Sequence, residues 1–122
     1  MSYYHLRPDA LDSPPDYPCE RRAFSDAAGL TTLHMATYHL DPGEDLARSY
    51  HYHEIREEAF YVLAGTLHVE TPEKEFVVET DEAFVVEPTN PIRPYNPADA
   101  GDPVRVLGTG SPKTDPARPY EG

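Results

Sequence analysis

Two histidines and a glutamate stand close together in the middle of the chain, in the stretch between Gly43 and Gly65. His51 and His53 are two residues apart, and Glu58 follows five residues after His53. Residues i and i+2 of a strand point to the same face, so an extended segment over 50–53 would direct both imidazoles to one point. Two histidines and one carboxylate form a facial triad, which leaves open coordination positions on a divalent metal such as Fe(II). The spacing therefore predicts a metal pocket with His51, His53 and Glu58 as ligands.

The metal in such a pocket would be Fe, Mn, Ni or Zn, depending on geometry and on whether a fourth ligand joins. A water molecule or another strand histidine (His34, His39 or His68) could supply that ligand. The alternative interpretation places the two histidines of the motif in solvent at a polar strand end. A buried Glu58 would need a partner, because an unpaired buried carboxylate is costly, whereas its neighbour Glu57 would face solvent.

Short strands separated by turns must position these residues. Alternating or apolar runs predict strands at 30–40, 58–63, 66–70, 74–79, 83–87 and 103–107. The run at 83–87 is continuous and apolar, so we expect it to be buried on both faces. Residues 24–29 are typical of a turn, and no segment carries a helical apolar stripe. Together the strands and turns predict an all-β barrel or sandwich.

The two ends of the chain differ in composition from its centre. Four prolines before residue 19 predict an irregular N-terminal arm over 1–23, with at most a short strand at 3–6. Three tyrosines in this arm indicate that it packs on the barrel or on a partner chain. We expect the barrel itself over 24–109. The proline- and glycine-rich residues 110–122 predict a loose tail or an arm.

The spacing H-x-H-x4-E-x6-G from His51 to Gly65, preceded by Pro42 and Gly43, resembles the first motif of the cupin superfamily. The resemblance is to the small single-domain cupin-2 type and extends to Val106. Two residues more than usual separate Gly43 from His51. The resemblance implies a jelly-roll β-barrel and a homodimer in which the arm covers an exposed sheet edge.

The second motif of that family, roughly G-x5-P-x-G-x2-H-x3-N, corresponds to residues 81–96. Asn96 matches the pattern. Three positions depart from it where Gly, Pro and Gly are usual, namely Asp81, Glu87 and Thr89. Ile92 stands where the third metal histidine of the family would be, and an isoleucine cannot ligate a metal. A metal in the usual place would be held by the three ligands of the first motif alone, or would recruit another group.

The same alignment places Arg93 at the barrel mouth. There its guanidinium could bind a carboxylate substrate in bidentate fashion. The alternative is a surface ion pair with one of the many acidic residues. Phe60 and Tyr95 would line the substrate pocket or belong to the core, because aromatic walls are normal for small-ligand sites.

The net charge is −12, from 22 acidic and 10 basic residues. Such a field repels nucleic acid and anionic membranes, so we expect neither as a partner. The acidic residues are spread along the chain, which favours adaptation to a salt-rich cytoplasm over an acidic interaction surface. The single cysteine, Cys19, excludes an internal disulfide. No apolar run approaches the length of a membrane span, and the N-terminus lacks signal-peptide features, so we expect a cytoplasmic protein.

Three functions stay open at this point. The first is a metal-dependent enzyme with dioxygenase-type or isomerase-type chemistry on a small acid. The second is a non-catalytic module that binds a small molecule or a metal. The third is a structural dimer with a relic pocket. The missing third histidine argues against a standard metal-binding cupin, and the intact first motif argues against a pure relic.

Overall fold

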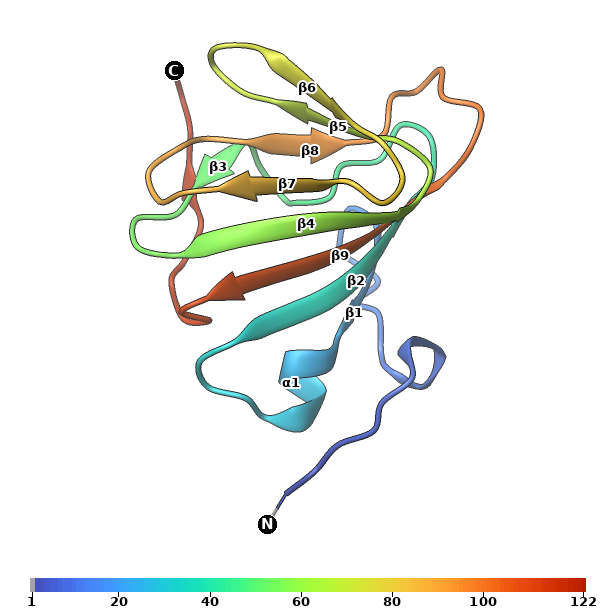
Figure 1. The fold of residues 1–122 in the computed structure, drawn as a ribbon, viewed down its shortest axis with the longest axis vertical. Helices are drawn as coiled ribbons and strands as arrows, with labels where there is room; N and C mark the ends of the chain where they lie inside the picture. The colour runs from blue at the N-terminus through green and yellow to red at the C-terminus, as the bar shows by residue number, and fades with distance from the viewer. Residues whose placement is uncertain (1) are drawn as a thin grey trace.

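The computed structural model of the chain describes residues 2–122, and strands dominate it (Figure 1). The all-β class predicted from the sequence is confirmed. Among the described residues, helical structure is limited to the 3-10 turn η1 (Pro8–Ala10) and to α1 (Phe24–Ala28), and neither is long and apolar enough to cross a membrane. The strands are β1 (Glu20–Ala23), β2 (His34–Leu40), β3 (His51–Tyr52), β4 (Glu57–Ala64), β5 (Leu67–Glu70), β6 (Glu75–Val78), β7 (Ala83–Val86), β8 (Arg93–Tyr95), β9 (Val104–Ser111) and β10 (Arg118–Pro119).

The strands form three antiparallel sheets. The largest has five strands in the order β1-β2-β9-β4-β7, and Figure 1 shows its long central strands side by side. A second sheet has the order β6-β5-β8, and the third pairs β10 with β3. Because β9 lies between β2 and β4, residues far apart in the sequence line one continuous inner face.

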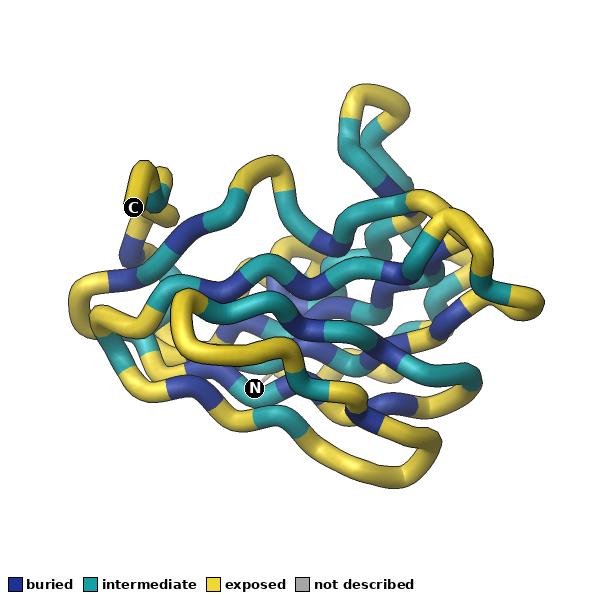
Figure 2. The backbone as a smooth tube through the Cα atoms, turned by 90° about the horizontal axis from the view of Figure 1, so that it is seen from above, coloured by how far each residue is buried: buried dark blue, intermediate teal, exposed yellow. Residues whose placement is uncertain are grey.

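Alternating side chains on these strands build the core. Every second residue of β2 is buried, and the same alternation runs along β5 and β9. Figure 2 shows buried and less buried residues alternating along the tube. Fully burying one such aliphatic side chain contributes roughly 2 kcal/mol. The core is therefore concentrated on the inner face, with its largest fully buried aliphatic side chains at Leu40, Val62, Leu67, Val69, Ile92, Val104 and Val106.

The inner face of β9 changes character along the strand. Val104 and Val106 fill the core at one end, whereas Gly108 and Gly110 take the same face at the other end. A Cβ atom on Gly108 would lie 2.8 Å from the ring of Tyr38, and one on Gly110 would lie 2.9 Å from Cδ of Arg56. These two close contacts require glycine at positions 108 and 110. Polar side chains from the neighbouring strands consequently occupy this end of the barrel.

Three local expectations are wrong. Residues 24–28 form α1 and not a turn, because Gly29 adopts φ +68° and closes a helical turn. The arm contains a strand at β1, whose partner is β2, and not at 3–6. The strand β7 is not buried on both faces, since Val85 is 68% exposed. The outward-facing Ala83 and Val85 are exposed, whereas Phe84 and Val86 are intermediate and buried, so β7 packs with one face only.

The C-terminal segment is an ordered arm. Its strand β10 pairs with β3, and the amide of Tyr120 donates to the carbonyl of Tyr50 at 2.8 Å. Asp115, in the middle of the segment, is buried. Of the two alternatives that the sequence left open, the arm is therefore the one observed, whereas the domain boundaries at 23/24 and 109/110 stay predictions.

The backbone of the second motif region includes two non-glycine residues with positive φ. Asp81 has φ +68° and Thr89 has φ +72°. These are the two positions where glycine is usual in the family pattern. A β-branched residue in this conformation is strained. The conformation of Thr89 accompanies a hydrogen bond from its amide to the carbonyl of His53 at 2.7 Å.

Candidate metal centre and adjoining cavity

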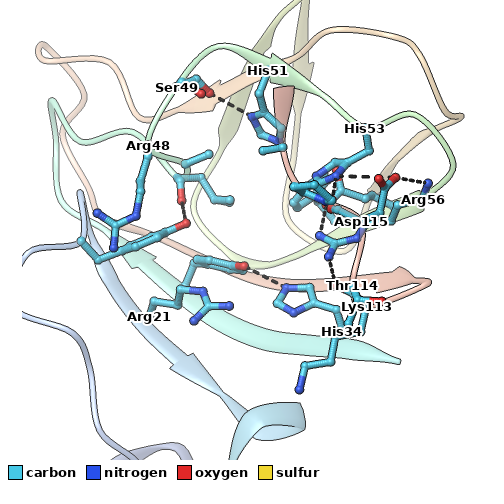
Figure 3. Close-up of a pocket in the computed structure, with 18 of the residues that line it drawn as sticks. Arg21, His34, Arg48, Ser49, His51, His53, Arg56, Lys113, Thr114 and Asp115 are labelled. Atoms are coloured by element: carbon cyan, nitrogen blue, oxygen red, sulfur yellow. Dashed lines mark hydrogen bonds and ion pairs between the residues drawn. The ribbon is translucent and has the colours of Figure 1, made fainter. Parts of the chain in front are cut away.

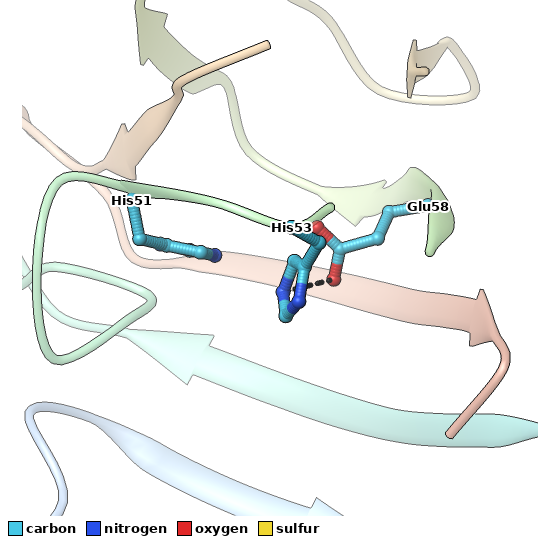
Figure 4. Close-up of side chains that lie close together, drawn as sticks. All are labelled: His51, His53 and Glu58. Atoms are coloured by element: carbon cyan, nitrogen blue, oxygen red, sulfur yellow. Dashed lines mark ion pairs between the residues drawn. The ribbon is translucent and has the colours of Figure 1, made fainter. Parts of the chain in front are cut away.

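His51, His53 and Glu58 converge at the glycine end of the barrel (Figure 4). Each of the three offers one ligand atom, and these atoms lie within 4.8 Å of one another. All three residues are buried. His51 belongs to β3 and Glu58 to β4, and a short connection carries His53 between them. The convergence predicted from the spacing of the motif is therefore present in the structure.

Backbone hydrogen bonds set the position of the two histidines. His51 exchanges two backbone bonds with Ile92, at 3.1 and 2.8 Å. Directly opposed residues of an antiparallel pair share one face, so Ile92 stands beside His51, where it is 2% exposed. The carbonyl of His53 accepts the amide of Thr89. The second motif region thus supports the histidines through its backbone.

The tautomers of both imidazoles follow from their hydrogen bonds. Nδ1 of His51 lies 2.9 Å from the carbonyl oxygen of Ser49, and Nδ1 of His53 lies 2.8 Å from that of Asp115. A carbonyl only accepts, so each Nδ1 carries the proton and donates it. In the neutral form of each ring the lone pair is then on Nε2. This is the arrangement in which a second partner orients a metal-ligating histidine.

Charges around the triad are balanced. Oε2 of Glu58 lies 3.6 Å from Nε2 of His53 and 3.4 Å from Nη1 of Arg56. Burial lowers the pKa of His53, Arg56 and His51 lower it further, and Glu58 and the carbonyl of Asp115 oppose the shift. The lowered pKa favours the neutral form of His53, which is the form in which an imidazole binds a metal. Two imidazole nitrogens and a carboxylate fit a divalent cation.

Sequence reasoning missed the role of Asp115. Its carboxylate accepts the amides of Ile55 and Arg56, both at 2.8 Å, and the bond from Ile55 is the largest cause of its lowered pKa. Its carbonyl holds His53. The residue thereby fixes the turn between the two parts of the motif. An aspartate in a proline-rich tail gives no sequence signal of this role.

A cavity of about 660 Å³ adjoins the triad (Figure 3). This volume is within the usual range for small-molecule sites. Phe60, one of the expected pocket residues, lines it. Tyr38 and His34 lie on its opposite wall, with the Tyr38 hydroxyl 3.2 Å from Nε2 of His34. Burial, with help from Arg21 and Arg56, lowers the pKa of His34 to about 4.

The other two expected pocket residues lie elsewhere. Arg93 and Tyr95 are on β8, in the three-stranded sheet, and are not among the residues that line this cavity. Arg93 forms ion pairs of 3.0 Å with Asp45 and with Glu70. The surface ion pair, the alternative interpretation of Arg93, is thus what the structure shows, while Tyr95 donates a short hydrogen bond to Glu75.

None of the remaining described histidines joins the triad. His34 and Glu58 both pair with Gly110 from opposite sides, so two strand spacings, about 10 Å, separate their backbones. His39 lies 3.2 Å from Asp41, and the ring of His68 is 5.7 Å from that of Tyr95. A fourth protein ligand is therefore not provided by the histidines of β2 or β5.

Comparison with protein families agrees with this geometry. The model of the cupin domain family Cupin_2 matches residues 36–109, more than half of the chain. The chain belongs to the cupin family. The predicted cupin-2 resemblance and the jelly-roll fold are confirmed. No curated relative matches the sequence.

Several solved structures share the cupin fold. A sugar phosphate isomerase from Silicibacter pomeroyi has a TM-score of 0.80 at 20% identity, with 98% of this chain and 83% of that chain covered. The polyketide cyclase RemF from Streptomyces resistomycificus has a TM-score of 0.79 at 17% identity, with 98% and 86% covered. A candidate sugar phosphate isomerase from Acidithiobacillus ferrooxidans has a TM-score of 0.68 at 21% identity. The match covers 76% of this chain and 58% of that chain. Identities this low show the fold alone.

Proposed function

We propose that this cupin binds a divalent metal through Nε2 of His51, Nε2 of His53 and the carboxylate of Glu58. The observation that carries the proposal is the pair of Nδ1–H donors held by the carbonyls of Ser49 and Asp115. They direct both lone pairs toward a buried carboxylate in a group whose ligand atoms span 4.8 Å. Fe, Mn, Ni and Zn are the candidates for such a donor set.

The proposed activity is metal-dependent chemistry on a small organic molecule bound in the cavity. Bound at the triad, the metal would polarise a substrate oxygen as a Lewis acid or serve as a redox centre. The chain itself would orient the ligands, hold Glu58 between His53 and Arg56, and enclose the substrate against Phe60 and Tyr38. Isomerase-type and dioxygenase-type reactions fit this arrangement, and the similar structures of a sugar phosphate isomerase and a polyketide cyclase support a small-molecule role.

A non-catalytic binding module is the second candidate. It is favoured by Ile92, which fills the place of a third histidine with a buried aliphatic side chain. Oxygen-consumption and isomerase screens on the metal-loaded protein separate the two, because only an enzyme turns substrate over. The homodimer, the cytoplasmic location and the adaptation to salt stay predictions.

Metal content tests the proposal. Protein purified without a tag or chelator is analysed by elemental mass spectrometry beside a His51→Ala/His53→Ala double variant. His39→Ala is the matched control, because His39 lies outside the triad on the strand β2. We expect near-stoichiometric metal in the native protein and the control, and its loss in the double variant. Absence of metal after reconstitution with Fe(II), Mn(II), Ni(II) and Zn(II) would overturn the metal site.

Ile92→His provides the complementary gain-of-function test. The new imidazole would share the face of His51, since the two residues are directly opposed. A fourth ligand in that place should slow metal loss to a competing chelator by about tenfold or more. An unchanged rate of metal loss would show that the metal does not bind next to His51 and residue 92.

A further inference from the structure

Positive charge gathers in the cavity of an otherwise acidic protein. Of the 10 basic residues in the chain, four line it, namely Arg21, Arg48, Arg56 and Lys113. Three acidic residues share the lining, so the cavity carries a local excess of positive charge while the whole chain carries −12. Such a concentration of cations in a cleft attracts anions that the rest of the surface repels.

Two of these cations are bound to the protein itself. Arg56 donates to the carbonyls of Pro112 and Lys113 and to Glu58. Lys113 lies 3.0 Å from Asp26 and donates to the carbonyl of Leu30 at 2.9 Å. Their donors hold the C-terminal arm and α1 in place. They are therefore structural cations.

Arg21 and Arg48 make weaker contacts with the protein. Nη1 of Arg48 donates to the carbonyl of Asp16 at 3.3 Å, and Arg21 hydrogen-bonds to Tyr38. The carboxylates nearest to Arg21 and Arg48, Asp26 and Asp16, lie at 3.8 and 3.7 Å. Strong hydrogen bonds between charged groups are nearer to 2.8 Å. The guanidinium of Arg93 outside the cavity shows the contrast, because it holds two carboxylates at 3.0 Å each. Arg21 and Arg48 thus retain donor capacity that Arg93 has already used.

Both guanidinium groups contact the ring of the same tyrosine. They lie over the ring of Tyr17, with 5.5 Å from its centroid to Arg21 and 5.0 Å to Arg48. The hydroxyl of Tyr17 donates to the carbonyl of Leu46 at 2.8 Å, which fixes the ring. Figure 3 shows Arg21 and Arg48 on the side of the cavity away from His53. The side chain of Arg21 is 20% exposed and that of Arg48 is 57% exposed, so Arg48 is nearer the mouth.

The segment that carries Arg48 is also where the chain departs from the family spacing. Two extra residues separate Gly43 from His51, and four residues of that loop line the cavity, from Leu46 to Ser49. Arg21 comes from β1, directly opposite Tyr38 on β2 and on the same face. The basic end of the cavity is therefore assembled from a loop and a strand outside the metal motif.

We infer that Arg21 and Arg48 form an anion subsite for the terminal carboxylate or phosphate of a small organic ligand. The other end of the ligand reaches His51, His53 and Glu58, and in this respect the inference rests on the proposed function. Three strand spacings, about 14 Å, separate the backbones of β1 and β4. Side chains from both strands reach into this space, so a ligand the size of a sugar phosphate or an aromatic acid spans it.

Binding of matched charged and neutral probes tests the subsite by calorimetry. The carboxylate arm compares phenylacetate with phenylacetamide, and the phosphate arm compares ribose 5-phosphate with ribose. We expect at least one charged probe to bind about tenfold or more tightly than its neutral counterpart, in protein with and without metal. The pair of probes with the larger ratio of affinities shows whether the subsite prefers a carboxylate or a phosphate.

Variants show which residues cause the preference for charged probes. Arg21→Met/Arg48→Met should abolish the charge preference while metal content stays unchanged, and the single Arg48→Met should reduce it with little risk to folding. Arg105→Met on the exposed face of β9 is the matched control and should behave as wild type. Equal binding of charged and neutral probes, or a preference that survives the double variant, would overturn the subsite.

The outcome also separates this inference from the metal proposal. A charge preference that persists in His51→Ala/His53→Ala supports the subsite even where no metal binds. A preference seen only with metal and lost in that variant means that the anion binds the metal itself. That result would retain the metal site and reject the role of Arg21 and Arg48.

Discussion

The two ends of the cavity are built in different ways. At the metal end, His51, His53 and Glu58 come from eight consecutive residues, and main-chain carbonyls orient both histidines. At the basic end, Arg21 and Arg48 come from a strand and a loop, and both contact the ring of Tyr17. The end that carries the candidate metal ligands is buried, while the basic end opens to solvent through Arg48.

This difference separates reaction chemistry from ligand selection. A compact motif held by the backbone tolerates little change, because a shift of one residue turns a strand side chain to the opposite face. A basic wall built from long side chains on peripheral segments can change without disturbing the metal ligands. Related cupins could thus keep one metal corner and select different ligands, and variants of each end should act independently.

The largest expected effect concerns acid stability and belongs to the basic end. The pKa of His34 is lowered to about 4, mainly by burial, so between pH 6.5 and 4 the unfolded chain binds a proton that the folded chain does not. Stability is complete above pH 6.5 and falls by up to about 3 kcal/mol as the pH decreases to 4. The groups that act on His34 are Arg21, Asp26, Tyr38, Arg56 and Lys113.

Urea denaturation across this pH range measures the effect in wild type and in His34→Gln, which can still bond to Tyr38. The variant should lose this part of the pH dependence. His39→Gln, on the same strand but exposed to solvent beside Asp41, should keep it. Identical pH profiles for wild type and His34→Gln would contradict the assignment.

The second effect belongs to the metal end. Asp115→Ala removes the acceptor for two amides and loosens the carbonyl that orients His53. Loss of such a supporting partner should weaken metal binding by about 10- to 100-fold, as measured by competition with a chelator. Asp115→Asn keeps an acceptor oxygen and should recover much of the affinity. The preference for charged probes at Arg21 and Arg48 should persist in both variants. Its loss would show that the two ends of the cavity are coupled.

The smallest effect concerns the strained loop behind His53. Thr89→Gly relieves a φ of +72° in a β-branched residue. The gain is partly offset by the greater freedom of glycine in the unfolded chain, so stability should rise by about 0.5–1 kcal/mol. Thr31→Gly in an exposed bend is the control and should be slightly destabilising. A destabilised Thr89→Gly would show that the Thr89 side chain contributes to the site.

Much of the fold was predictable, because strand alternation and the motif spacing are local properties. The run from His51 to Gly65 predicted the three candidate ligands. Gly65 is needed where predicted, since a Cβ there would lie 2.4 Å from the carbonyl oxygen of Pro103. Asp81 and Thr89 both adopt positive φ, a conformation that glycine adopts more readily. Residue type at those positions therefore gave no sign of the backbone conformation that the fold requires there.

The sequence by itself determined the all-β class, the cupin motif and the three ligand candidates, because a period of two and fixed spacings act over a few residues. Tertiary structure alone decided that Asp115 supports His53, a contact across 62 residues. It also decided that Arg21 and Arg48, and not Arg93, line the cavity. Arg93 is adjacent to a motif position, but strand pairing carries it to the other sheet, where Asp45 and Glu70 engage its guanidinium. Charges that meet through strand order and loop path leave no local pattern, so only the folded chain shows which cations line the cavity.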